Sequence, residues 1–149
     1  MMKFLVVIED NRGSIHRMSW EAISGAQKLG GNITALAIGT NAESLAQELS
    51  AVEIDKTLIV NHNMVATYNS DGYTEVVTNV IHSVEPDIII VGHSYQTRDF
   101  MPRVSARLDI PFISDVTMVE GDNYIKQVLN AKLNCTISSS SEKTILSFQ

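Results

Sequence analysis

The chain has 149 residues, with 11 lysines and arginines against 17 aspartates and glutamates, and its formal net charge is −6. This acidic balance, without any lysine or arginine cluster, excludes a general nucleic-acid binder, because such proteins carry a basic face. A single cysteine, Cys135, excludes a disulfide framework within the chain and is typical of cytoplasmic proteins. We therefore expect a cytoplasmic protein with no nucleic-acid partner.

The length predicts a single domain over residues 1–149. A chain of this size buries about 70% of its unfolded surface, which is enough for one substantial core. The first apolar run, Phe4 to Ile8, is too short for a signal peptide or a membrane span. No direct membrane insertion is expected.

Strands and helices are predicted to alternate along the first two thirds of the chain. Apolar runs without polar alternation are typical of strands covered on both faces, and they occur at residues 3–9, 32–39, 57–60 and 87–91, with a fifth strand starting near Phe112. Between them, apolar residues at helical spacing predict helices at residues 15–29, 42–52, 73–84 and 100–108. The pattern predicts a three-layer α/β fold, a Rossmann-like open parallel sheet with helices on both faces.

Capping residues set the expected ends of these helices. Ser14 is the predicted N-cap of the first helix, and Gly30 is expected to end it in the left-handed conformation. Pro86 is expected to stop the third helix.

Beyond Ser114 the pattern changes to strands without intervening helices. They are predicted at residues 116–120, 124–130, 133–138 and 144–148. We expect all four to form an antiparallel extension at one edge of the sheet. Leu133, Cys135 and Ile137 alternate with polar residues, which indicates one covered face and places Cys135 as a buried small hydrophobe.

The segment from Asp87 to Val116 is the most informative for function, because ligands of open parallel sheets sit beyond the carboxyl ends of the strands. A polar loop, His93 to Thr97, is predicted there between a strand and a helix. The candidate cofactor-binding residues are therefore Gly92, Ser94, Thr97 and Arg98, since backbone N–H groups before a helix favour an anion. The structural alternatives are that Gly92 makes a tight turn and that Thr97 is a helix N-cap.

Motifs for other chemistry are absent from the sequence. There is no G-x-G-x-x-G after a strand and no G-x-x-x-x-G-K-[ST], so no phosphate loop is expected. The four histidines, His16, His62, His82 and His93, have no i, i+4 pair, which makes a zinc site improbable; His93 is expected as a surface loop residue. No nucleophile stands beside a base, so we expect no catalytic residue and no enzyme activity.

Several stretches together resemble the amino-terminal domain of the electron transfer flavoprotein alpha subunit. They are KFLVVIED at residues 3–10, KLGGNITALAIG at 28–39, NAESLAQELS at 41–50, IDKTLIV at 54–60, TRDFMPRVSARL at 97–108 and ISDV at 113–116. The resemblance covers nearly the whole chain. The chain departs from the family where Thr97 replaces a usual glycine and where residues 129–132 replace a "YAGN"-like turn.

The resemblance implies an adenine nucleotide alpha hydrolase-like fold and a scaffold or docking role. In the family a second, carboxyl-terminal domain follows and holds most of the FAD contacts, so FAD is expected in the full-length protein and not in this domain alone. The implied partners are an electron transfer flavoprotein beta subunit and, through the complex, acyl-CoA or other dehydrogenases and a quinone oxidoreductase. Electrons would then pass from dehydrogenases to the respiratory chain.

Arg103 and Arg107 lie one turn apart on the fourth helix, which makes them candidates for an interface with a partner or with the missing domain, or else part of a solvated face. A second function from another class remains open. The residues Ser94 to Arg98 are also compatible with a stand-alone sensor that binds AMP or ATP, similar to universal stress proteins.

Overall fold

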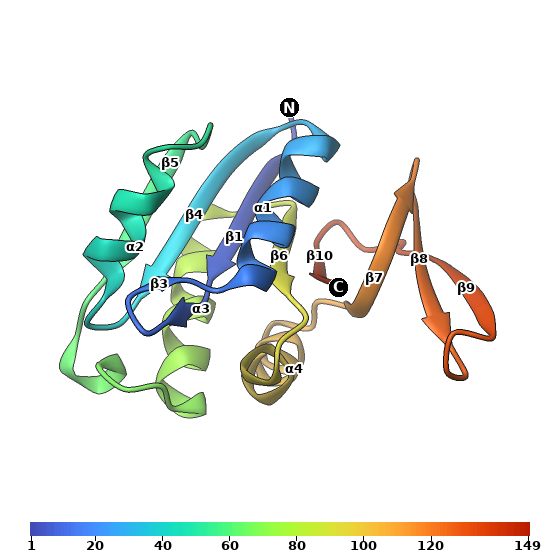
Figure 1. Ribbon diagram of the computed structural model, residues 1–149. Coiled ribbons are helices and arrows are strands. Elements are labelled where there is room, and N and C mark those ends of the chain that lie inside the picture. Colours follow the sequence, from blue (N-terminus) through green and yellow to red (C-terminus); the bar gives the residue numbers. More distant parts are fainter.

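The computed structural model describes residues 1–149 and contains an eight-stranded sheet with helices on both faces (Figure 1). The strands of this sheet are β1 (Lys3–Ile8), β4 (Asn32–Ile38), β5 (Lys56–Val60), β6 (Ile88–Gly92), β7 (Phe112–Glu120), β8 (Asn123–Val128), β9 (Leu133–Ser138) and β10 (Thr144–Phe148). The helices are α1 (Arg17–Leu29), α2 (Ala42–Leu49), α3 (Ser70–Val84) and α4 (Tyr95–Leu108). A short hairpin of β2 (Asp10–Asn11) and β3 (Ser14–Ile15) and a 3₁₀ turn, η1 (Asn63–Val65), complete the chain.

The strand order is β5-β4-β1-β6-β10-β7-β8-β9. The first six strands run parallel, and β8 and β9 follow antiparallel. This confirms the predicted Rossmann-like α/β fold with antiparallel strands toward the carboxyl-terminal end.

Alternate residues of the buried strands feed two separate apolar clusters, one on each face of the sheet. In β1, for example, Phe4, Val6 and Ile8 pack with α1 and α2, whereas Leu5 and Val7 pack with α3 and α4. Figure 1 shows α1 and α2 in front of the sheet and α3 behind it, whereas α4 is seen end-on below the sheet. Strands covered in this way on both faces read as continuous apolar runs, which is why the pattern of the sequence identified them.

The last strand, β10, lies elsewhere than predicted. It does not extend the antiparallel edge but inserts between β6 and β7 and pairs parallel with both. All five of its residues are buried, as expected for an interior strand. The chain therefore returns from the antiparallel edge into the middle of the sheet, a long-range pairing that no local pattern encodes.

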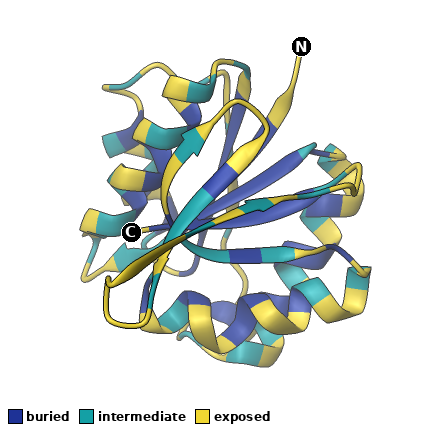
Figure 2. Cartoon of the chain, turned by 90° about the vertical axis from the view of Figure 1, so that its right-hand side faces the viewer, coloured by how far each residue is buried: buried dark blue, intermediate teal, exposed yellow.

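Residues 117–138, which form the outer half of β7 with β8 and β9, extend beyond the two helical layers, and we call them the wing. Figure 2 faces the wing and shows it mostly exposed or intermediate, in contrast to the buried strands behind it. No residue of β9 is buried, and Cys135 is only half-buried, so the prediction of a buried cysteine was wrong. The cause is that no helix covers the wing.

Two helix starts also differ from the sequence-based prediction. Ser14 and Ile15 belong to the small hairpin, and the N-cap of α1 is His16, whose Nδ1 accepts the Met18 N–H. Helix α4 begins at Tyr95, so Thr97 is inside it rather than at its N-cap. Gly30, with φ of 71°, caps α1 as expected, and α3 ends at Val84, before Pro86.

Candidate functional site at the carboxyl ends of the central strands

A crevice of about 540 Å³ opens between the carboxyl ends of β1 and β6, where the strand order changes direction. This is the position at which open α/β sheets bind their ligands. Its walls come from the end of β1 and from the first turns of α1 and α4, through Glu9, Asn11, His16, Arg17, Met18, His93, Ser94, Tyr95 and Arg98.

Gly92 closes the floor of this region against α1. A Cβ atom at Gly92 would lie 2.6 Å from Met18 Cβ and 2.7 Å from the Met18 carbonyl carbon and oxygen. Its φ is not positive, so a strained turn does not explain the glycine. Glycine is required because the backbone of α1 packs directly onto the end of β6, and the close approach made here is to a helix and not to a ligand.

Ser94 and Thr97 are used in capping α4. The Thr97 N–H donates to Ser94 Oγ at 3.1 Å, and the Ser94 hydroxyl contacts Thr97 Oγ1 at 3.3 Å. Both side chains are buried. Ser94, rather than Thr97, is therefore the N-cap, and the predicted five-residue loop contains only His93 and Ser94.

Arg98 is the basic group that the structure does bring to the crevice. Its guanidinium carbon lies 5.7 Å from the ring centroid of Tyr95, which is 88% exposed. Neither Arg98 nor Arg17, the other arginine of the crevice, forms an ion pair, since the two ion pairs of the protein lie elsewhere. The crevice thus combines two uncompensated guanidinium groups with one acid, Glu9.

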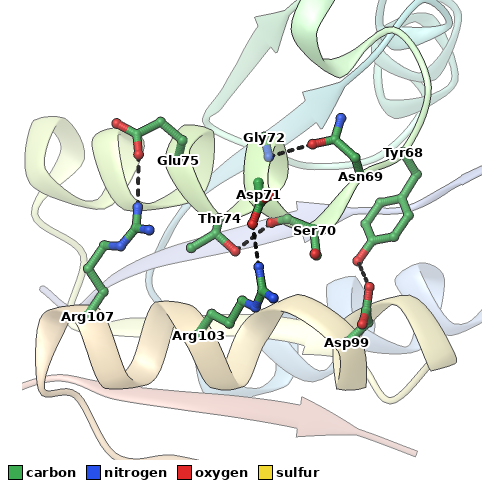
Figure 3. A network of polar contacts seen from close by, with 10 residues as sticks. All are labelled: Tyr68, Asn69, Ser70, Asp71, Gly72, Thr74, Glu75, Asp99, Arg103 and Arg107. Carbon is green, nitrogen blue, oxygen red and sulfur yellow. Dashed lines mark hydrogen bonds and ion pairs between the residues drawn. The ribbon is translucent and has the colours of Figure 1, made fainter.

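Arg103 and Arg107 point toward α3, as Figure 3 shows. Arg103 pairs with Asp71, and Arg107 Nη1 lies 2.8 Å from Glu75 Oε2. The guanidinium groups remain about half exposed, so these are surface ion pairs that link α3 and α4.

A third polar contact of α4 involves Tyr68, which lies just before α3 and whose hydroxyl donates to Asp99 Oδ2 at 2.6 Å (Figure 3). Burial and the Asp99 carboxylate raise the pKa of Tyr68 above its ordinary value, so the phenol remains protonated. Together these contacts explain the polar residues on the outer face of α4.

A second polar group, which sequence reasoning missed, lies where β6, β10 and β7 meet. His93 Nδ1 lies 3.0 Å from Ser147 Oγ, and the same oxygen accepts the Asp115 N–H at 2.8 Å. We call His93, Ser147 and Asp115 the joint. Ser147 is completely buried and its neighbours in sequence are apolar, so only the position of β10 could have revealed its role.

Asp115 is the most unusual residue of the joint. Its φ of 61° is left-handed inside a strand, and its Oδ1 is buried without a hydrogen-bond partner. Strand β7 nevertheless continues through Asp115 to Glu120.

His93 is half-buried and bonded, not a free loop residue. Burial lowers its pKa below the ordinary 6.5, the Asp115 carboxylate opposes this shift, and the positive charges of Arg98 and Lys126 add to it. The ring is therefore neutral at neutral pH.

No three histidine, cysteine, aspartate or glutamate residues come together in a way that suits a metal ion. None of the helices has both the length and the apolar character that crossing a bilayer requires.

Comparison with known proteins gives consistent matches. The pattern of the electron transfer flavoprotein domain matches residues 4–149. The electron transfer flavoprotein subunit alpha of Bacillus subtilis (strain 168) is 34% identical over 127 residues, which are 83% of this chain and 39% of that protein. The subunit of the same name from Clostridium acetobutylicum is 30% identical over 78% of this chain and 36% of its own length.

A further relative, the acryloyl-CoA reductase electron transfer subunit beta of Anaerotignum propionicum, is 29% identical over 90% of this chain and 38% of its own length. The chain therefore spans less than two fifths of the length of each of these relatives. Because the family pattern covers almost every residue and the predicted fold is present, the chain belongs to the electron transfer flavoprotein domain family and corresponds to the amino-terminal domain of the alpha subunit.

Proposed function

We propose that this chain is the scaffold and docking domain of an electron transfer flavoprotein alpha subunit in the cytoplasm. It holds a beta subunit and a flavin-binding domain in place while FAD carries electrons from dehydrogenases, including acyl-CoA dehydrogenases, to a quinone oxidoreductase of the respiratory chain. The family match over residues 4–149, at less than two fifths of the length of the relatives, is the observation that carries this proposal.

The FAD site lies outside this chain in our proposal, and the chain is not an enzyme by itself. The end of β6, where a phosphate would approach the backbone, is closed by the first turn of α1 through the contact between Gly92 and Met18. The Ser94 and Thr97 hydroxyls are buried in the cap of α4. These contacts support a cofactor site outside this chain.

Absorbance spectroscopy tests the location of the flavin. The purified 149-residue chain, mixed with excess FAD and then desalted, is expected to show no flavin band. Retention of one FAD per chain would overturn the proposal that the cofactor site lies elsewhere.

Docking is tested by mixing the chain with an electron transfer flavoprotein beta subunit and measuring complex formation by calorimetry. We expect a one-to-one complex. Arg103→Gln and Arg107→Gln examine the surface predicted from the sequence: a loss of affinity of about tenfold or more would place these residues in the interface, because that exceeds the ~1 kcal/mol contribution of an exposed ion pair. Lys56→Gln, on the opposite edge strand, is the matched control.

A second candidate function, nucleotide sensing, is favoured by one observation. The crevice brings Arg17, Arg98 and the exposed Tyr95 together, and such groups suit a phosphate and a base. Calorimetry with AMP and ATP tests it. Binding in the micromolar range that is lost in Arg98→Gln would establish a nucleotide site, whereas the absence of heat at millimolar nucleotide would eliminate this function.

A further inference from the structure

The wing is attached to the body at an interruption of the sheet. Leu146 of β10 pairs with Ile113, but the next pair joins Phe148 to Val116, so two residues of β7, Ser114 and Asp115, lie opposite the single residue Ser147. At this interruption the Ser147 hydroxyl accepts the Asp115 N–H at 2.8 Å. A side-chain oxygen thus takes the place of a backbone carbonyl at the point where β7 leaves the body.

The proton of that hydroxyl needs an acceptor inside the protein. Ser147 is completely buried, so its O–H cannot turn to water, and an unsatisfied buried donor is unfavourable. His93 Nδ1 lies 3.0 Å away and accepts this proton when the ring is neutral and carries its own proton on Nε2. The neutral Nε2–H tautomer therefore satisfies both the serine and the backbone of Asp115.

We propose that the joint is a proton switch for the wing. When a proton from solvent adds to His93 Nδ1, the ring loses its lone pair and the Ser147 hydroxyl loses its acceptor. Nδ1–H and Asp115 N–H then both point at Ser147 Oγ, and the buried serine O–H is left without an acceptor, which makes this arrangement of the joint unfavourable. The contact that holds Asp115 weakens, and the wing loosens from β10.

Charged groups on three elements face His93 and set the direction of the switch. Asp115 of β7 favours the protonated ring, whereas Arg98 of α4 and Lys126 of β8 oppose it. Glu9, His16 (the N-cap of α1) and Arg17 line the crevice that His93 also lines, which gives the ring a route to solvent. Burial has the largest effect and lowers the pKa of His93 below 6.5.

The sign of the pH dependence follows. Opening returns the ring toward its ordinary pKa, so opening becomes more favourable as the pH falls below 6.5. Well below the pKa of His93, the equilibrium constant for opening is about tenfold higher for each pH unit by which the closed joint lowers that pKa. Above pH 6.5 the wing stays attached.

Nuclear magnetic resonance of the whole chain tests the switch. Imidazole ¹⁵N shifts report the protonation and tautomer of His93, and hydrogen exchange of the β8 and β9 amides reports the wing, both followed from about pH 8 to pH 5 across the range of histidine titration. We expect a neutral Nε2–H ring at the upper end. After correction for the intrinsic pH dependence of exchange, opening of the wing should increase with the same midpoint as His93.

Variants distinguish protonation of His93 in the joint from other effects of low pH on the protein. His93→Asn, whose Oδ1 matches the position of Nδ1 and accepts the serine proton at every pH, should abolish the increase. His82→Gln, on the exposed surface of α3, should retain it. Asp115→Asn removes the opposing carboxylate, so both midpoints should move together to lower pH.

Two results would overturn the proposal. One is a wing whose opening does not change with pH although His93 titrates; the other is a wing midpoint that stays in place when Asp115→Asn moves that of His93. The first comparison uses only the natural chain, so it decides the question even where a variant fails to fold.

Discussion

At the scale of single residues, close contacts decide what the crevice can do. Gly92 was predicted as a candidate for cofactor binding, because a glycine at a strand end lets a ligand approach the backbone in many α/β proteins. The atoms nearest to its missing side chain are Met18 Cβ and the Met18 carbonyl group, however, so steric fit to α1 explains the residue.

Gly92→Ala should lower the free energy of unfolding by about 1–3 kcal/mol, because the new methyl group meets backbone atoms that cannot move independently. Gly25→Ala is the matched comparison. There the nearest atom is Cε2 of the Phe148 ring at 2.8 Å, a side chain that can rotate, and alanine favours a helix interior. Urea denaturation measures both, and an equal effect of the two substitutions would contradict the packing of α1 on β6.

The buried phenol of Tyr73 leads to a second prediction about a single residue. Burial, with smaller contributions from Asp10 and Glu9, raises the pKa of Tyr73 from 10.0 to about 12. The neutral form is thus favoured by folding, so the stabilisation is complete below pH 10 and is lost as the pH rises toward 12.

In Tyr73→Phe the free energy of unfolding should fall less steeply as the pH rises. Some pH dependence should remain, because burial also raises the pKa values of Tyr68 and Tyr124. The Tyr73 hydroxyl makes only a long contact, 3.5 Å to the Ile38 carbonyl, so the variant should fold. Tyr95→Phe removes an exposed phenol and serves as the control. Denaturation at a series of alkaline pH values is the measurement, and an unchanged slope in Tyr73→Phe would refute the prediction.

At the scale of elements, the sequence predicted those helices and strands whose apolar residues follow a regular spacing. The apolar stripe of α3, with Val77 and Ile81 buried, and the five parallel strands follow directly from spacing. Helix starts were less certain, because Ser14 and Thr97 are as suitable for capping as His16 and Ser94, and tertiary contacts choose between them. The location of β10 was unpredictable for a similar reason, since a five-residue strand with three apolar residues fits an edge and an interior position equally well.

Two leucines near the end of the chain test this arrangement of strands. Leu146 of β10 is fully buried, so Leu146→Ala should reduce the free energy of unfolding by about 2–5 kcal/mol. Leu133 of β9 is 56% exposed, so Leu133→Ala should change it by no more than about 0.5 kcal/mol. Thermal or urea denaturation compares them. Similar losses would mean that β10 is an edge strand or that the wing is covered.

At the scale of the whole molecule, the body and the wing differ in how they are held. Each central strand is paired on both sides and covered by helices, whereas β9 pairs only with β8 and has no buried residue. The candidate site could be predicted only in part from the sequence. Arg98 was identified because it follows a strand, whereas Ser147 and Asp115 come together only because β10 inserts beside β7.

Such a difference predicts two levels of hydrogen-exchange protection. Amides of β8 and β9 should exchange through local openings that depend weakly on denaturant, because opening the wing exposes little apolar surface. Amides of β1 and β6, whose side chains are buried in the two clusters, should exchange only with global unfolding. Native-state exchange at neutral pH, where His93 is neutral, measures both without engaging the joint. Equal protection of β9 and β1 would show that the wing and the body unfold as one unit.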